Sequence, residues 1–294
     1  MNLKYTYKNI GAKYWDMFYS SGVSKITQSV DDMLGFSYAE IIYYLDENEK
    51  KFNVVDIGPG NAYPVKDIIN YLYKNDTLSR YIGIDISQEI NQIAEKNLNS
   101  WFPKLEVLTY ERDLESSKIS NIVLGNKTSD ETNIILYIGN TLGNHDDRVE
   151  ILKHLRSGMT PEDLMITTFT LDVPANRAVL NYVKSLESDL HQGWIPEMLG
   201  IDLNLCEVVV EYNAKLNCKT KGFKLDKDYD IEFKLPNRTE IINLKKDQVI
   251  NTWKHYLVDS INFINEARAA KLEVIDLKTD KTGTNAMAIC RVKL

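Results

Sequence analysis

The chain has 294 residues, of which 44% are apolar, so it can bury a full core as one large domain with an elaboration. Its net charge of −7 disfavours a general nucleic-acid-binding protein, which usually carries a basic stripe. The sequence contains no apolar run of about 18 residues, and its three cysteines lack C-x-x-C spacing, so we expect a cytoplasmic protein with no membrane span and no bound metal.

The first 50 residues are rich in aromatic side chains. Tyr14 and Phe18 are four residues apart, a spacing that places both on one face of a short helix. Such residues can simply cover a face of the sheet, or they can form a lid over a ligand, because tyrosine and tryptophan combine an apolar ring with a polar group. We predict an N-terminal helical lid segment over residues 1–50.

An apolar strand that runs into a glycine turn begins at residue 53. Residues 53–61 read N-V-V-D-I-G-P-G-N, and a helical pattern follows them. This order predicts the first strand, turn and helix of a nucleotide-binding α/β sheet. Asp56, Gly58 and Gly60 are candidate cofactor-binding residues, since glycine lets a ligand approach the backbone closely.

A second strand carries Asp85 and Ile86 at its carboxyl end. An acidic side chain about 20 residues beyond a glycine turn is where a ribose diol is bound. A nicotinamide dinucleotide and an adenosine without a pyrophosphate both fit this pattern. Tyr63 replaces the third small residue of the dinucleotide loop, and Pro64 follows it, which favours a phosphate-free ligand such as S-adenosylmethionine.

Two further strands are predicted to end at the same edge of the sheet. Residues 105–113 read as a third strand, whose final carboxylate is a candidate partner for an adenine amino group. Residues 133–138 read as a fourth strand that leads into the polar loop G-N-T-L-G-N. Ligands of open α/β sheets bind beyond the carboxyl ends of the strands. The predicted cofactor site is completed by Asp113, Gly139 and Asn140.

The pattern changes in the second half of the chain. After a fifth strand at residues 164–170, the periodicity is helical over residues 173–203, and short strands with lysine-rich turns follow. We predict a mainly antiparallel insertion over residues 173–246, in which residues 215–227 form a solvated turn.

The C-terminal residues 247–294 are predicted to belong to the same core as residues 51–172. We predict a long helix over residues 249–270, followed by two closing strands. The core then comprises residues 51–172 and 247–294, with an antiparallel finish to a parallel sheet.

The four histidines show no metal-ligand spacing. We interpret His154, His191 and His255 as ordinary surface or partly buried residues. His145 is singled out because it directly follows Asn144.

The glycine turn, Asp85 and above all residues 138–144 (I-G-N-T-L-G-N) resemble the histidine-specific methyltransferase family. The order of parts agrees over nearly the whole chain: an aromatic N-terminal segment, a Rossmann-like core, and an insertion before the last helix and strands. The resemblance implies an α/β class I methyltransferase fold, a substrate-binding role for the insertion, and S-adenosyl-L-methionine as the cofactor.

The resemblance also implies residues that hold the methyl acceptor. The family's loop asparagine, which holds the amino acid head group, corresponds to Asn144, and the tyrosine that holds the substrate carboxylate corresponds to Tyr182. A tyrosine near the substrate corresponds to Tyr14. The glutamate that reads the imidazole corresponds to Glu240, whereas its partner serine is replaced by Ile242. The implied acceptor is a small amino acid or related amine, and the resemblance does not specify the identity of its side chain.

These residues predict an S-adenosylmethionine-dependent methyltransferase that methylates an α-amino group by direct in-line transfer. A sulfonium methyl group is already activated, so proximity and orientation suffice and no general base is nominated. The alternative is a catalytically silent domain of the same fold that binds adenosine or a partner. A nicotinamide-dependent oxidoreductase is a third interpretation, which Tyr63 disfavours.

Overall fold

The computed structural model describes residues 3–21, 41, 43–44, 51–139, 141–178 and 186–294. Within this part of the chain, no helix is both long enough and apolar enough to cross a membrane.

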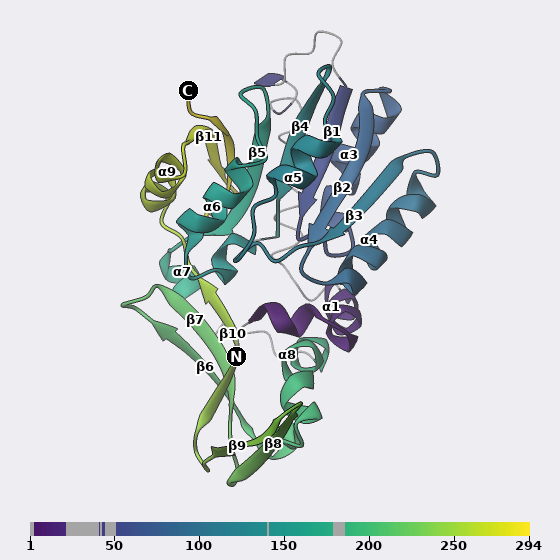
Figure 1. The fold of residues 1–294 in the computed structure, drawn as a ribbon. Helices are drawn as coiled ribbons and strands as arrows, with labels where there is room; N and C mark the ends of the chain where they lie inside the picture. Colours follow the sequence, from purple (N-terminus) through teal and green to yellow (C-terminus); the bar gives the residue numbers. More distant parts are fainter. Residues whose placement is uncertain (1–2, 22–40, 42, 45–50, 140, 179–185) are drawn as a thin grey trace.

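A seven-stranded sheet in the order β11-β12-β5-β4-β1-β2-β3 forms the core, as Figure 1 shows. The five strands from β5 to β3 in this order are parallel, and β12 runs antiparallel between β5 and β11. The central strands are buried on both faces, which explains their nearly continuous apolar sequences. The strands are β1 (Lys51–Ile57), β2 (Leu78–Asp85), β3 (Glu106–Glu111), β4 (Glu131–Tyr137), β5 (Leu164–Thr170), β11 (Leu272–Thr279) and β12 (Asn285–Val292).

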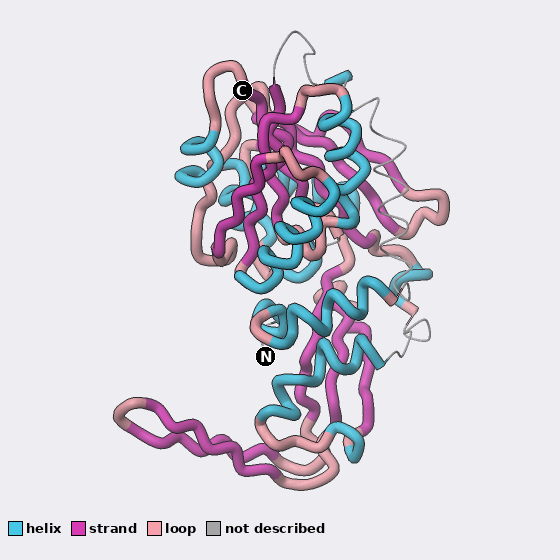
Figure 2. The backbone as a smooth tube through the Cα atoms, turned by 90° about the vertical axis from the view of Figure 1, so that its right-hand side faces the viewer, coloured by secondary structure: helices cyan, strands magenta, loops and turns pink. Residues whose placement is uncertain are grey.

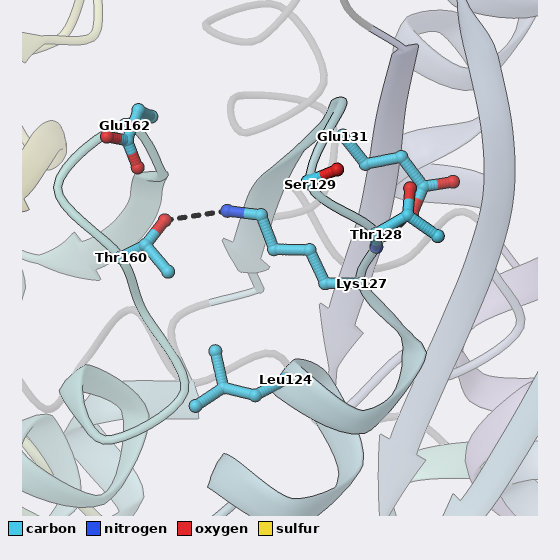
Figure 3. Close-up of a pocket in the computed structure, with 7 residues that line it drawn as sticks. All are labelled: Leu124, Lys127, Thr128, Ser129, Glu131, Thr160 and Glu162. Atoms are coloured by element: carbon cyan, nitrogen blue, oxygen red, sulfur yellow. Dashed lines mark hydrogen bonds between the residues drawn. The ribbon is translucent and has the colours of Figure 1, made fainter.

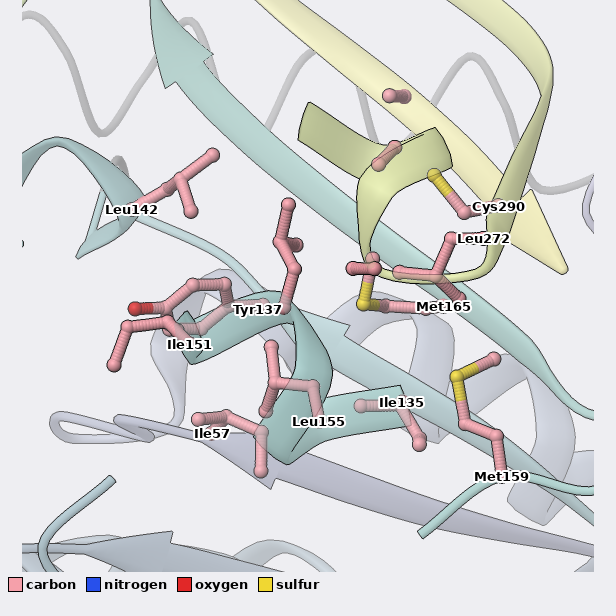
Figure 4. Packing of buried hydrophobic residues seen from close by; sticks show 14 of the residues in the cluster. Ile57, Ile135, Tyr137, Leu142, Ile151, Leu155, Met159, Met165, Leu272 and Cys290 are labelled. Carbon is pink, nitrogen blue, oxygen red and sulfur yellow. The ribbon is translucent and has the colours of Figure 1, made fainter. Parts of the chain in front are cut away.

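Helices cover both faces of the sheet and create two hydrophobic layers. Alternate residues of one strand serve the two layers: Ile135 faces α6 and α9, whereas Ile134 faces α3 and α4. Figure 4 shows the first layer, where Tyr137, Leu155 and Leu272 pack together. The core helices are α3 (Lys66–Lys74), α4 (Gln88–Trp101), α5 (Ser120–Val123), α6 (Arg148–Arg156) and α9 (Ser260–Ala269).

The chain reverses direction across the sheet at β1. It builds β2 and β3 on one side of β1 and then crosses to β4 on the other side. In an open α/β sheet this reversal opens a crevice at the carboxyl ends of the strands, and ligands bind there.

A second, smaller unit lies beyond those carboxyl ends, in the lower part of Figure 1. An antiparallel sheet in the order β10-β7-β6 forms its body, and the hairpin β8–β9 projects from it (Figure 2). Helix α1 packs against α8 beside this unit. The elements are η1 (Leu3–Tyr7), α1 (Ile10–Ser20), α7 (Pro174–Arg177), α8 (Leu186–Met198), β6 (Glu207–Asn213), β7 (Cys218–Lys224), β8 (Tyr229–Leu235), β9 (Arg238–Leu244) and β10 (Val249–Tyr256).

Two expectations from the sequence are wrong in this unit. Much of the lysine-rich stretch expected as a solvated turn is β7, the middle strand of its sheet, and Lys221 in it is fully buried. The long helix expected over residues 249–270 is divided: residues 249–256 form β10, whose β-branched and aromatic residues suit a strand. Helix α9 starts only after Asp259, whose carboxylate accepts hydrogen bonds from the first-turn amides.

A buried polar network closes the opposite, amino-terminal end of the sheet. Glu131 accepts hydrogen bonds from the Asn53 amide at 3.1 Å and the Ser79 hydroxyl at 2.6 Å, and lies 3.4 Å from Arg80. Burial opposes ionisation of Glu131, but these partners and the Thr128 amide together lower its pKa to about 2.

A surface pocket of about 400 Å³ lies at this same end of the sheet (Figure 3). Its lining residues Lys127 and Thr160 are hydrogen-bonded to each other at 2.6 Å, and Lys127 also pairs with the buried Asp163 at 2.7 Å. The pocket is therefore at the edge opposite to the carboxyl ends where such sheets bind ligands.

We expect Glu131→Gln to reduce the free energy of unfolding by about 1–3 kcal/mol near neutral pH, because an ionised, hydrogen-bonded acceptor is lost. The folded-state pKa lies below the ordinary value of 4.5, so this contribution is present above about pH 4.5 and is lost as the pH falls toward about 2. Urea unfolding at neutral pH and at about pH 3 measures the change. Glu106, the exposed second partner of Arg80, is the matched control, and Glu106→Gln should change stability by less than about 0.5 kcal/mol. Equal effects of the two substitutions would contradict the assignment.

Candidate active site

The structure brings the predicted glycine turn, Asp85 and the loop after β4 together. A Cβ atom placed on Gly58 would lie 4.0 Å from Asp85 Oδ2 and 3.7 Å from Thr141 Cγ2. Gly58 has φ of +67°, a conformation that favours glycine. Gly139 lies next to Thr141, and Ile86 follows Asp85 directly. These residues thus meet at the carboxyl ends of the neighbouring strands β4, β1 and β2.

Two carboxyl groups of this region are held in a low-polarity environment. Asp56 accepts a hydrogen bond from the Tyr81 hydroxyl at 2.7 Å, and Asp85 accepts one from the Ser87 amide at 2.8 Å. Burial raises the pKa of Asp56 to about 7, and the negative charge of Asp85 raises it further. The hydrogen bond from Tyr81 acts in the opposite direction and lowers it. Burial likewise raises the pKa of Asp85 to about 7, although backbone amides oppose it. Hydroxyl donors, such as those of a ribose, would stabilise the ionised form.

The N-terminal helix covers the glycine turn. The indole ring of Trp15 lies where a Cβ atom of Gly60 would be, so only glycine fits under this ring. Asp16 accepts a hydrogen bond from the Asn61 amide at 2.8 Å. Tyr14, one residue before Trp15, is half-buried on the same helix. The aromatic N-terminal segment therefore contributes directly to the predicted cofactor site.

The 3-10 turn before this helix is held to the end of β3 by ion pairs. Lys4 lies 2.8 Å from Asp113 and 2.7 Å from Glu115, and Lys8 lies 2.9 Å from Glu111. The predicted adenine partner Asp113 is thus bound to the N-terminal segment. Its role toward adenine stays a prediction.

Asn144 lies in η4 (Thr141–Asn144) and is in contact with a residue of the smaller unit. His255 of β10 has Nδ1 at 3.2 Å from Asn144 Oδ1 and Nε2 at 3.2 Å from Thr170 Oγ1. Because an amide oxygen only accepts, Nδ1 carries the proton and Nε2 accepts from the Thr170 hydroxyl. Gly143 permits this approach, since a Cβ atom there would collide with the imidazole ring.

The His255 ring is uncharged at neutral pH. Burial, aided by the charges of Lys219 and Arg148, lowers its pKa to about 4. The ring of Trp253 stacks on it with centroids 5.7 Å apart and planes 9° apart. His255 was expected to be an ordinary histidine. In a strand, residues two apart such as Trp253 and His255 lie on the same face of the sheet. The sequence could have indicated this pair if residues 249–256 had been predicted as a strand and not as a helix.

The other residues singled out in the sequence do not all lie beside Asn144. Glu240 lies on β9, is half-exposed and pairs with Arg238 at 2.6 Å. Its hairpin points away from the core (Figure 2), so the structure does not bring Glu240 to Asn144. His145 lies 3.3 Å from Glu115. Tyr182 and Asn140 lie outside the described residues.

The fold and this carboxyl-end site define the class of protein. Solved structures with the same fold include an S-adenosylmethionine-dependent methyltransferase from Clostridium acetobutylicum, with 10% identity, a TM-score of 0.53 and coverage of 96% of this chain and 98% of that one. The magnesium protoporphyrin IX methyltransferase of Synechocystis, solved with bound SAH, has 12% identity and a TM-score of 0.53 over 99% and 97% of the two chains. The chain has the class I methyltransferase fold, as predicted.

The family is shown by the sequence itself. A model described as histidine-specific methyltransferase, SAM-dependent, matches residues 1–292, and the chain belongs to that family. A comparison with curated proteins gave no match. The chain is therefore an S-adenosylmethionine-dependent methyltransferase, and the predicted cofactor and enzyme class are confirmed.

The residues at the carboxyl ends fit this cofactor. Gly58, with φ of +67°, is only partly buried, and Asp85 Oδ2 faces it. We expect Asp85 to hold the ribose hydroxyls and the loop at Gly58 and Gly60 to hold the amino acid part.

We expect the affinity for S-adenosylhomocysteine to rise about tenfold between about pH 6 and about pH 8. The ionised Asp85 accepts two hydroxyls, and with a pKa of about 7 it is mostly protonated at the lower pH. Calorimetric titration across this range measures the affinity. Asp85→Asn should weaken binding and abolish the pH dependence, whereas Asp56→Asn should retain it. A pH dependence that persists in Asp85→Asn would contradict this role.

Proposed function

We propose that this enzyme transfers a methyl group from S-adenosylmethionine to the α-amino group of a small amino acid or a related amine. The supporting observation is the position of Asn144. It follows the cofactor loop by a few residues, and its amide oxygen accepts a hydrogen bond from His255 of the smaller unit. The acceptor would therefore lie between the core and the β10-β7-β6 sheet, beside the cofactor.

The hydrogen-bond chain fixes how Asn144 presents its amide. With Thr170 donating to His255 and His255 donating to Asn144, one lone pair of the amide oxygen is used. The second lone pair can accept from an amine, and both N–H groups can donate to a carboxylate. One amide can thus orient an amino acid head group without a salt bridge.

The acceptor nitrogen must be neutral to react. When bound, the cofactor supplies an activated methyl group, whose bond to sulfur breaks as the acceptor nitrogen forms its new bond to carbon. Asn144 orients the amine lone pair without a charge that would keep the amine protonated. The positive charges that lower the pKa of His255 disfavour an ammonium group in the same place. Proximity and orientation are the main contributions of the protein.

The two other segments have roles in this proposal. Of the predicted lid segment, we assign residues 3–21 to a cover over the cofactor, because Trp15 and Asp16 contact the glycine turn. Residues 22–40, 42 and 45–50 of that segment lie outside the described residues. We assign residues 173–246 to substrate binding and add β10, because β10 pairs with β7 and carries His255.

Wild-type enzyme incubated with S-adenosylmethionine and a panel of amino acids and amines tests the reaction. Mass spectrometry should detect products with one or more added methyl groups on the amine. S-adenosylhomocysteine binding without a methylated product from any panel member would favour the silent binding domain instead.

We expect Asn144→Ala to raise the KM for the acceptor by at least about tenfold, because a hydrogen bond to a charged head group contributes roughly 1.5–3 kcal/mol. The affinity for S-adenosylhomocysteine should change less than about twofold, since the predicted cofactor residues are separate. Steady-state kinetics and calorimetry give the two values. Asn243→Ala, on the exposed hairpin, is the matched control. Equal losses of acceptor and cofactor binding in Asn144→Ala would show that the loop belongs to the cofactor site.

A further inference from the structure

A row of polar side chains crosses the β10-β7-β6 sheet at the level of Asn144. In the strand register, Lys219 of β7 lies directly opposite His255 of β10 on one side and Tyr212 of β6 on the other. Directly paired residues of antiparallel strands have their side chains on the same face of the sheet. Tyr212, Lys219 and His255 therefore share one face.

This face is turned toward the carboxyl ends of the core strands. At one end of the row, His255 contacts Asn144 and Thr170. At the other end, the Tyr212 hydroxyl lies 3.5 Å from Asp172, just after β5. Lys219 lies between these two contacts, and its charge lowers the pKa of His255. Lys219 is thus on the same face of the sheet as His255, which contacts Asn144.

The positive charge of Lys219 has no carboxylate partner among the residues that the structure describes. The nearby Asp172 is already engaged by Arg177, at 2.7 Å and 3.0 Å. Arg148, the other cation that acts on His255, is paired with Glu266, with one contact at 2.9 Å. Burial lowers the pKa of Lys219, because its charge is partly removed from water.

We propose that Lys219 binds a carboxylate of the methyl acceptor and so helps to select the acceptor. This inference rests on the proposed function and adds a residue to its acceptor site. A carboxylate at Lys219 would neutralise the half-buried ammonium group. It would also place the rest of the acceptor along the row toward Asn144. The carboxylate is either the α-carboxylate or one in the side chain, and the two are distinguished below.

Binding to the enzyme saturated with S-adenosylhomocysteine tests this inference without requiring turnover. The probes are L-glutamate with two carboxylates, L-glutamine and L-histidine with one each, and histamine with none. Calorimetry should show that at least one of the amino acids binds about tenfold or more tightly than histamine. If Lys219 binds the α-carboxylate, a substitution of Lys219 will weaken the affinities for glutamine and glutamate equally. If Lys219 binds a side-chain carboxylate, the substitution will weaken the affinity for glutamate alone.

Lys219→Met keeps the aliphatic length and removes the charge. It should weaken the best amino acid probe by about tenfold or more and leave histamine unchanged, and Lys219→Arg should restore most of the loss. Lys224→Met, elsewhere on β7, is the matched control and should leave all affinities unchanged. Thermal unfolding and S-adenosylhomocysteine affinity confirm that the variants are folded.

The inference is overturned if Lys219→Met weakens no amino acid probe, if it weakens all four probes equally, or if histamine binds as tightly as every amino acid. Failure of the proposed function is a separate result. Amino acids that bind in a Lys219-dependent way but are never methylated would refute the transfer reaction and retain the carboxylate site.

Discussion

The hydrogen-bond chain from Thr170 through His255 to Asn144 joins the smaller unit to the core. Its central member is a buried neutral imidazole, which bonds at both ring nitrogens to residues of the core. Breaking this chain would leave buried polar atoms without partners, at a cost of roughly 1–3 kcal/mol each. The contact therefore fixes β10 beside the loop after β4. The position of the proposed acceptor site relative to the predicted cofactor site depends on this contact.

The two halves of the proposed site differ in charge. The predicted cofactor half holds Asp56 and Asp85, whose ionisation is opposed by burial and which would gain from hydroxyl donors. The proposed acceptor half holds Lys219 and a neutral histidine. An amine in the acceptor half meets positive potential, which favours its neutral form, while a carboxylate on the same molecule is attracted. This division of charge suits a zwitterionic acceptor better than a simple amine.

The fold core was predictable because its signals are local. The strand that ends at Ile57 and the glycine turn after it were recognised, and so was the acidic end of the second strand at Asp85. Buried parallel strands read as continuous apolar runs, and glycines mark the turns. The prediction failed at residues 249–256, where a strand with alternating polar and apolar residues was taken as the start of a helix. That error hid the strand positions of His255 and Trp253.

By itself the sequence determined the methyltransferase class, the cofactor and the approximate place of the glycine turn, Asp85 and the loop at Asn144. These features depend on short segments whose residues interact with the backbone next to them. Only the tertiary structure decided that Trp15 covers Gly60, that His255 contacts Asn144, and that Lys219 is the strand partner of His255. Such contacts join segments that are tens to more than a hundred residues apart, or follow from strand register, and they depend on how distant parts of the chain pack.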